Sequence, residues 1–149
     1  MKALVADDWK SPNPPLIAVV DDDASVRKAL GRLMRAAGFD ARTFATGREF
    51  LAACRTEPPE CVVLDMHMPE MSGLEVLRRL NDSGLFLPLV LITADDESRH
   101  CQLSLDQGAV ALLRKPVDGP QLIDRVEFAL TRGRLIHAMN ARLAAGVAR

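Results

Sequence analysis

Short apolar runs separated by amphipathic stretches dominate the chain. Continuous runs of strand length occur at 16–20, 61–64, 89–92 and 110–113, and a shorter, more polar run lies at 41–44. Continuous rather than alternating apolar runs are typical of parallel strands that are covered on both faces. The four runs therefore predict parallel strands that are covered on both faces, and the polar run predicts an edge strand.

Helical signals lie between these runs. Apolar residues from Val26 to Ala37 recur at i, i+3, i+4 and i+7, and Gly38 ends the helix that they predict. Two capping boxes, each with a hydroxyl residue three positions before a glutamate, open the next two helices: Thr46 with Glu49, and Ser72 with Glu75. Further helices are expected from after Asp95-Asp96 to Gly108, and from Asp118-Gly119-Pro120 onward.

The alternation of strand and helix predicts the fold class. Short loops and strict β-α order favour an α/β, doubly wound, five-stranded parallel sheet with five helices on its two faces. In such a fold the ligand binds at the carboxyl ends of the strands. The residues that follow each predicted strand are therefore the first candidates for function.

Composition narrows the function classes. The chain has 149 residues, 48% of them hydrophobic and 26% charged, with a net charge of -1, as in one ordinary globular domain. Charge near zero, one tryptophan and no tyrosine argue against nucleic-acid binding by this chain itself. No run reaches the ~20 apolar residues of a membrane span, and no signal peptide is visible, so we expect a cytoplasmic protein.

The cysteines indicate neither a disulfide framework nor a zinc site. Cys54, Cys61 and Cys101 are odd in number and lack C-x-x-C spacing. They are expected to be packing thiols rather than redox sensors, because no basic residue is placed to activate them.

Charged and hydroxyl residues follow the predicted strands: Asp21-Asp22-Asp23 after the first, Asp65 after the third, Thr93-Ala94 after the fourth and Lys115-Pro116 after the fifth. Clustered carboxylates repel unless a cation is present, and a small set of oxygen ligands favours Mg²⁺, with Mn²⁺ as the alternative. The lysine and the threonine are surplus to metal binding, so they indicate an anion such as phosphate. A carboxylate can itself be the nucleophile in phosphoryl transfer.

Five motifs in this order carry a resemblance: Val19-Val20-Asp21-Asp22, the segment 64–73 (LDMHMPEMSG), Ile92-Thr93-Ala94, Gly108-Ala109 and Lys115-Pro116. Together they resemble the receiver domain of two-component response regulators, over residues 16–131. The sequences at 26–30 (VRKAL) and 43–44 (TF) make the chain most similar to the nitrogen-fixation type of regulator, whose output domain is a LuxR-like DNA-binding helix-turn-helix. The resemblance implies a flavodoxin-like fold with strand order 2-1-3-4-5.

The resemblance also implies roles for the matching residues. Asp65 is then the phosphoacceptor, which takes a phosphoryl group from a sensor histidine kinase, and it is also one of the Mg²⁺ ligands. Asp22 binds Mg²⁺ directly, Asp21 mainly through water, and His67 through its backbone carbonyl.

The remaining implied roles concern the phosphoryl group and the switch. Thr93, followed by Ala94, binds one phosphoryl oxygen and shifts on phosphorylation, while Lys115 pairs with another oxygen. A cis peptide before Pro116 aims the lysine inward. The chain is then a signalling phosphoacceptor that catalyses only its own phosphorylation and dephosphorylation. The charge of the added phosphoryl group shifts one surface of the domain between two conformations.

Two positions depart from the family pattern or are unusual in it. Leu112 stands where family members carry a tyrosine or phenylalanine that swings inward behind the threonine. Either aliphatic packing replaces that aromatic ring, or the active face differs. His67 is unusual beside the acceptor; we expect an exposed side chain with only the carbonyl in use, the alternative being that the imidazole tunes hydrolysis of the acyl phosphate.

Two rival functions stay open at this point. A haloacid-dehalogenase-like phosphatase fits the D-x-D-x-S pattern of Asp21-Asp22-Asp23-Ala24-Ser25, with Thr93 and Lys115 in the right order, but it leaves Asp65 unexplained. The other rival is a degenerate receiver used only for docking, against which the intact acceptor, metal and lysine positions argue. Taken singly, Asp23 and Asp96 are expected only to cap helices.

The two ends of the chain are expected to lie outside the domain. Residues 1–15, with Trp9 and a proline-rich stretch, predict a flexible N-terminal extension. Residues 132–149 are expected to form a helix that frays into a linker to an output domain absent here, the alternative being a stand-alone receiver. A heptad seam offers a dimer on phosphorylation as a further alternative: Leu122, Val126, Ala129, Gly133, Ile136, Asn140, Leu143 and Val147.

Overall fold

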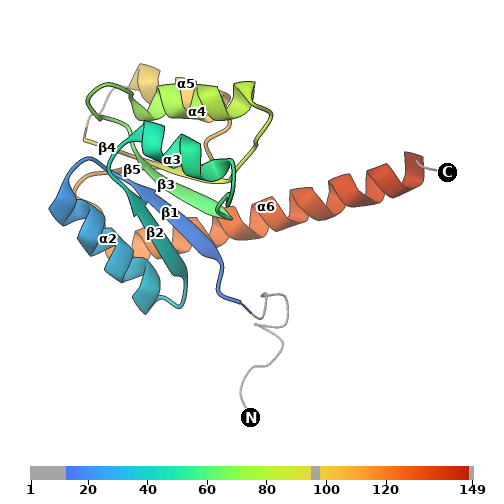
Figure 1. Cartoon of the computed structure of the whole chain (residues 1–149), viewed down its shortest axis with the longest axis horizontal. Coiled ribbons are helices and arrows are strands. Elements are labelled where there is room, and N and C mark those ends of the chain that lie inside the picture. Colours follow the sequence, from blue (N-terminus) through green and yellow to red (C-terminus); the bar gives the residue numbers. More distant parts are fainter. Residues whose placement is uncertain (1–12, 95–97, 148–149) are drawn as a thin grey trace, which may run out of the picture.

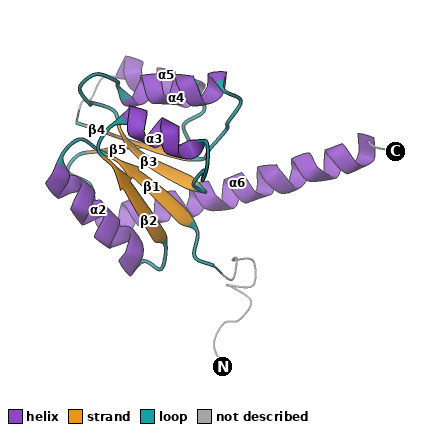
Figure 2. Cartoon of the chain, viewed as in Figure 1, coloured by secondary structure: helices purple, strands orange, loops and turns teal. Residues whose placement is uncertain are grey.

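Five parallel strands form the centre of the structure, a computed structural model that describes residues 13–94 and 98–147 (Figures 1 and 2). The strands are β1 (Leu16–Val20), β2 (Asp40–Phe44), β3 (Cys61–Asp65), β4 (Leu89–Thr93) and β5 (Ala111–Arg114). The helices are α2 (Ala24–Ala36), α3 (Gly47–Cys54), α4 (Gly73–Asp82), α5 (Ser98–Asp106) and α6 (Gly119–Val147). Strand and helix alternate throughout, as the apolar pattern predicts.

The sheet has the order β2-β1-β3-β4-β5, and every neighbouring pair is parallel. This confirms the doubly wound fold and the predicted strand order. The register aligns Val20 with Leu64 and Asp65 with Ile92. The carboxyl ends of β1, β3 and β4 therefore lie at one edge of the sheet, where the predicted site residues follow.

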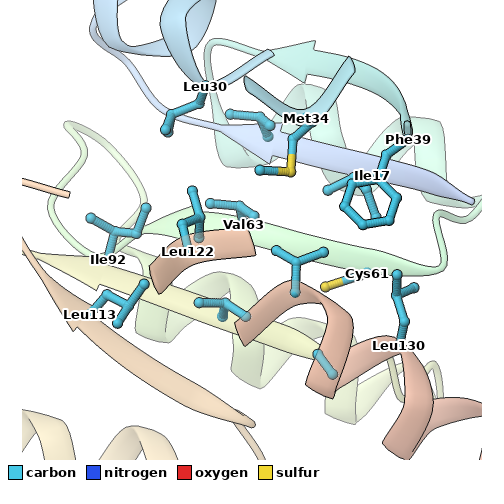
Figure 3. Close-up of a cluster of buried hydrophobic side chains, with 14 residues drawn as sticks. Ile17, Leu30, Met34, Phe39, Cys61, Val63, Ile92, Leu113, Leu122 and Leu130 are labelled. Atoms are coloured by element: carbon cyan, nitrogen blue, oxygen red, sulfur yellow. The ribbon is translucent and has the colours of Figure 1, made fainter. Parts of the chain in front are cut away.

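Each face of the sheet carries its own hydrophobic core. Ile17 and Val19 point to the face covered by α2 and α6, where Met34 and Leu122 are fully buried (Figure 3). The intervening residues of β1 point to the opposite face, which α3 and α4 cover. Burial of both faces explains why the strands have continuous apolar runs.

The predicted helix starts are confirmed by their capping bonds. The Oγ1 atom of Thr46 accepts a bond of 3.0 Å from the Glu49 N–H, and Ser72 accepts one of 3.2 Å from Glu75. Asp23 caps α2 by accepting from the backbone N–H groups of Ser25 and Val26, and Gly38 follows its end with a φ of 94°. Asp96 lies outside the described residues.

One glycine sets the distance between α4 and the end of β3. A Cβ atom on Gly73 would lie 2.6 Å from the carbonyl oxygen of Asp65 and 2.9 Å from the Cα of Met66. Both are backbone atoms that cannot move aside, so only glycine permits this approach. The loop after Asp65 is thereby held against α4.

The C-terminal helix differs from the expectation of a fraying linker. It continues from Gly119 to Val147, so α6 extends well beyond the sheet (Figure 1). Leu122, Val126 and Ala129 are buried in the domain core, which removes the first part of the heptad seam from any dimer contact. Ile136 and Leu143, further along α6, are exposed.

The fold begins before residue 16, and the two cysteines whose burial the structure describes are buried. Pro15 already belongs to the fold, because its carbonyl accepts a bond of 2.9 Å from Asp40 N–H, whereas Trp9 lies outside the described residues. Cys54 and Cys61 are buried free thiols, and burial raises their pKa to about 11 and about 12. None of the described helices is long and apolar enough to span a membrane.

Candidate functional site

Three carboxylates meet at the carboxyl edge of the sheet. One oxygen each of Asp21, Asp22 and Asp65 lies within 4.8 Å of the other two. Asp21 and Asp65 are only 1% and 3% exposed, whereas Asp22 is open to solvent. The fold therefore brings together the carboxylates of β1 and β3 that the sequence analysis selected.

Asp21 is held in place by its own loop. Its Oδ1 atom accepts a bond of 2.9 Å from Asp23 N–H, and its backbone carbonyl accepts one of 2.8 Å from the Arg27 guanidinium. Burial raises the pKa of the Asp21 carboxyl, and the bond from Asp23 and the charge of Lys115 offset this only in part. Among the described residues, nothing donates to its buried Oδ2 atom.

Asp65 faces both the carboxylates and a lysine. Its Oδ1 atom accepts a bond of 3.2 Å from His67 N–H, and its Oδ2 atom lies 3.5 Å from the Lys115 ammonium. Burial and the neighbouring charge of Asp21 raise the pKa of this carboxyl, while the contacts with His67 and Lys115 lower it. The buried carboxylate thus has one oxygen beside a cation and the other beside a backbone donor.

Lys115 reaches the site from the loop after β5. Its backbone N–H donates a bond of 2.8 Å to the carbonyl of Thr93, and the following peptide bond, to Pro116, is cis, as expected. The side chain is half-buried, which places its ammonium beside Asp65 rather than in open solvent. The backbone of Lys115 is thus tied to β4 and its side chain to β3.

Thr93 and His67 interact directly, which the sequence analysis did not foresee. Thr93 ends β4 and is buried, and its Oγ1 atom lies 3.3 Å from the Nε2 atom of His67. The residue His67 is exposed as predicted, but the prediction that only its carbonyl is in use is wrong, because the imidazole engages Thr93. No spacing rule links a residue of the β3 loop to the end of β4, so the sequence holds no signal for this contact. Ala94, the next residue, is exposed.

Leu112 occupies the position at which the resemblance leads one to expect an aromatic ring. The side chain is partly buried and packs against the core on the α3 and α4 face of the sheet. Aliphatic packing therefore fills this position.

A divalent cation fits the carboxylate cluster. Two buried acids and one exposed acid supply oxygen atoms on one side, and the Oδ2 atom of Asp21 is buried with no donor among the described residues. Buried polar atoms are normally satisfied, so this oxygen is suited to a ligand. Oxygen-only donor sets are those of Mg²⁺ and Mn²⁺.

Asp23 is separated from this cluster by its capping role. Its Oδ1 atom accepts from the hydroxyl of Ser25 at 2.7 Å and from the backbone of α2, which lowers the pKa of its carboxyl. The second aspartate of the D-x-D-x-S pattern is thus engaged in helix capping rather than in the site.

The family model described as "Response regulator receiver domain" matches residues 17–127. The chain belongs to the response regulator receiver family. This assignment favours the receiver over the phosphatase alternative, because it accounts for Asp65 and the residues that follow it. No conventional enzyme activity is implied by the family.

Curated relatives are regulators of greater length. The chain is 35% identical over 125 residues to the transcriptional regulatory protein TdiR of Thauera aromatica, covering 84% of this chain and 55% of TdiR. It is 39% identical over 119 residues to the response regulator MprA of Mycolicibacterium vanbaalenii, covering 80% and 52%. The receiver chain thus spans about half the length of the curated relatives it matches.

Solved structures share the fold. The response regulator StyR is similar with a TM-score of 0.81 and 36% identity, over 89% of this chain and 67% of StyR. FIXJ-N is similar with a TM-score of 0.75 and 29% identity, over 80% of this chain and 95% of FIXJ-N. These likenesses agree with the five-stranded parallel fold and its strand order.

Proposed function

We propose that this receiver accepts a phosphoryl group on Asp65 from a phosphohistidine of a sensor kinase. A carboxylate oxygen of Asp65 attacks phosphorus, the P–N bond breaks, and the bond electrons leave with the kinase imidazole. The product is an acyl phosphate. The observation that carries the proposal is the placement of a buried carboxylate beside both a carboxylate cluster and the Lys115 ammonium.

Two side chains would stabilise the transferred group. The Lys115 ammonium, 3.5 Å from Asp65, is positioned to pair with a phosphoryl oxygen, and the Thr93 hydroxyl faces the same edge from β4. Both would neutralise charge on the equatorial oxygens during in-line transfer. The Thr93 hydroxyl would exchange its contact with His67 for a phosphoryl oxygen, which couples acceptance of the group to movement of the β4 end.

Asp21, Asp22 and Asp65 would hold Mg²⁺, with Mn²⁺ as a substitute, together with the His67 carbonyl that the family resemblance assigns to this role. When bound, the cation supplies positive charge that screens the carboxylates and the incoming phosphoryl group. The exposed position of Asp22 gives solvent access to the cluster, while burial of Asp21 fixes its geometry.

The proposal extends to the domain organisation and the output. Residues 16–131 would be the receiver, together with Pro15, which already contacts β2; residues 1–14 would be an extension, and the α6 extension at 132–149 would link to an output that regulates transcription in a longer protein of cytoplasmic location. The relationship to FIXJ-N supports the nitrogen-fixation type, and the transcriptional role of TdiR supports the output. Exposed Ile136, Met139 and Leu143 offer an apolar stripe for a homodimer on phosphorylation.

Intact-mass measurement after treatment with acetyl phosphate and Mg²⁺ tests the acceptor. The wild-type chain and the Asp82→Asn control, which changes an exposed carboxylate of α4, are expected to gain one phosphoryl group, and the Asp65→Asn variant none. Equal modification of all three proteins would exclude Asp65. No modification of the wild type would favour a docking-only receiver, and steady turnover of phosphomonoesters would favour a phosphatase.

A further inference from the structure

A groove opens at the edge of the sheet opposite the carboxylates. It has a volume of about 500 Å³ and is lined by residues that precede β3 and β4 and by residues of α6. Its apolar surface comes from Phe86, Pro88, Leu130 and Ile136, and Phe86 is 76% exposed. The volume is that of a ligand pocket, about 300–1,000 Å³. Aromatic and aliphatic surface is therefore presented to solvent at one place.

The walls of the groove are fixed to each other. A Cβ atom on Gly133 would lie 2.5 Å from the Cγ atom of Pro88, so glycine allows α6 to approach the start of β4 closely. The guanidinium of Arg134 lies 3.3 Å from the carboxylate of Glu60, which joins α6 to the start of β3. The groove is consequently preformed, which lowers the entropic cost of binding.

The amino-terminal part of the chain enters the fold at this rim. The N–H of Glu60, a lining residue, donates a bond of 2.8 Å to the carbonyl of Leu16. Trp9 stands six residues before Pro15, and the stretch between them includes Pro12 and Pro14. Proline-rich segments favour the extended polyproline helix, at about 3.1 Å per residue, so Trp9 has a reach of roughly 19 Å from Pro15.

The acidic residues before Trp9 are complementary in charge to the α6 wall of the groove. Asp7 and Asp8 precede Trp9, and α6 contributes the exposed Arg132 to the lining, whereas Arg134 is already paired with Glu60. A segment running from Leu16 across the groove toward α6 would bring Asp7-Asp8 to the side of Arg132. Opposite charges then face each other on the α6 wall.

We propose that residues 1–12 dock in this groove, with the indole of Trp9 against Phe86 and Ile136 and with Asp7-Asp8 beside Arg132. The occupant is the chain's own amino-terminal segment. Docking covers the base of the α6 extension at Ile136 and ties both ends of the chain to one edge of the sheet. The inference is independent of the phosphoacceptor function.

Tryptophan fluorescence of the full chain tests the docking. Trp9 is the only tryptophan and the chain has no tyrosine, so indole emission reports on this residue alone. The native protein is expected to emit at shorter wavelength than the same protein in urea and to be quenched less by acrylamide. Phe86→Ser and Ile136→Ser should each move emission and quenching toward the urea values. Native emission equal to that in urea would overturn the proposal.

Matched controls separate docking from loss of structure. Phe128→Ser changes a different exposed phenylalanine, which lies on α6 outside the groove and is 54% exposed, and should leave the emission unchanged. Arg132→Glu should increase acrylamide quenching, whereas Arg125→Glu, on the exposed side of α6 away from the groove, should not. Far-UV circular dichroism confirms that each variant is folded. Equal effects of groove and control variants would overturn the proposal.

Dilution identifies the source of the segment. If the chain fills its own groove, the short-wavelength emission is independent of protein concentration. Loss of that emission on dilution would show that the segment comes from a second copy and would overturn the proposal.

Discussion

The Nε2 atom of His67 lies 3.3 Å from the Oγ1 atom of Thr93. This contact joins the loop after the proposed acceptor to the residue that we propose to bind the phosphoryl group. The hydroxyl therefore has a partner in the present structure that competes with a phosphoryl oxygen. We therefore expect the imidazole of His67 to position the Thr93 hydroxyl in the switch.

The His67→Ala variant is expected to bind a phosphoryl analogue more tightly. Removing the competing contact, worth about 0.5–1.5 kcal/mol for one hydrogen bond, favours the state in which Thr93 faces the phosphoryl group. Titration with beryllofluoride and Mg²⁺ should give a Kd roughly 2- to 10-fold lower. His137→Ala, on α6, is the control and should match the wild type. A weaker or unchanged affinity of His67→Ala would contradict the competing role of the imidazole.

The Asp21→Asn variant is expected to be more stable than the wild type in EDTA at pH 7. Burial raises the pKa of Asp21 above its ordinary 3.8, so the charged carboxylate is disfavoured in the folded protein. Its contribution to stability is present below the ordinary pKa and is lost as the pH rises through the raised one. The neutral amide should restore about 1 kcal/mol, and raise Tm by about 2–4 °C.

Thermal unfolding at pH 7 and at pH 3.5 checks the sign of this effect. The gain in Tm should shrink at the lower pH, where the wild-type carboxyl is mostly protonated in both the folded and the unfolded state. The Asp82→Asn variant, at an exposed position of α4, should show no gain at either pH. A gain that is equal at both pH values would show that the charge of Asp21 is not its cause.

Magnesium is expected to stabilise the wild-type chain through the carboxylate cluster. A cation at 100 times its Kd adds about 2.7 kcal/mol to the free energy of unfolding when it binds only the folded state. The Asp22→Ala variant should lose most of this gain, because it removes the exposed ligand of the cluster. Asp124→Ala, on the exposed side of α6, should keep it. Differential scanning calorimetry with and without Mg²⁺ measures both, and equal gains would argue against the site.

The Gly133→Ala variant is expected to be destabilised although alanine favours helix formation. The added methyl group would meet the Cγ atom of Pro88 at 2.5 Å, and overpacking costs about 1–3 kcal/mol. Urea unfolding should therefore show a lower midpoint, and adding Pro88→Ala should recover part of the loss. Gly119→Ala, whose Cβ would lie 3.5 Å from Leu33, is the control at an uncrowded position. A stabilised Gly133→Ala would mean that α6 packs less closely than described.

Most of the sheet was predictable because burial on both faces leaves continuous apolar runs. The three central strands β1, β3 and β4 and the polar edge strand β2 follow this rule, whereas β5 has an apolar run although it lies at the other edge and only Leu113 in it is buried. The bounds differ by one residue: β3 and β4 extend to Asp65 and Thr93, and β5 begins at Ala111. The helix starts followed from capping residues whose bonds are local. By contrast, the length of α6 was not predictable, because a glycine in the middle of an isolated helix weakens that helix. The structure gives the reason for a glycine at position 133, which is the close approach of α6 to Pro88.

The candidate site also has a part that the sequence predicts and a part that it does not. Asp21, Asp65, Thr93 and Lys115 follow strand ends, so topology alone predicts that they lie at one edge. The contact between His67 and Thr93, the bond from Arg27 to the Asp21 carbonyl and the close approach at Gly73 depend on side-chain and loop geometry that no periodicity encodes. These are the features that only the structure reveals.

The most direct test of the account identifies the phosphorylated residue itself. Borohydride reduces an aspartyl phosphate to homoserine, and trypsin then separates two peptides of interest: residues 56–78, which contain Asp65 as their only aspartate, and residues 11–27, which contain Asp21, Asp22 and Asp23. After treatment with acetyl phosphate and Mg²⁺, peptide mass spectrometry is expected to show homoserine at position 65 and unmodified aspartates in 11–27. Homoserine in peptide 11–27, with position 65 unmodified, would contradict the assignment of Asp65 as the acceptor.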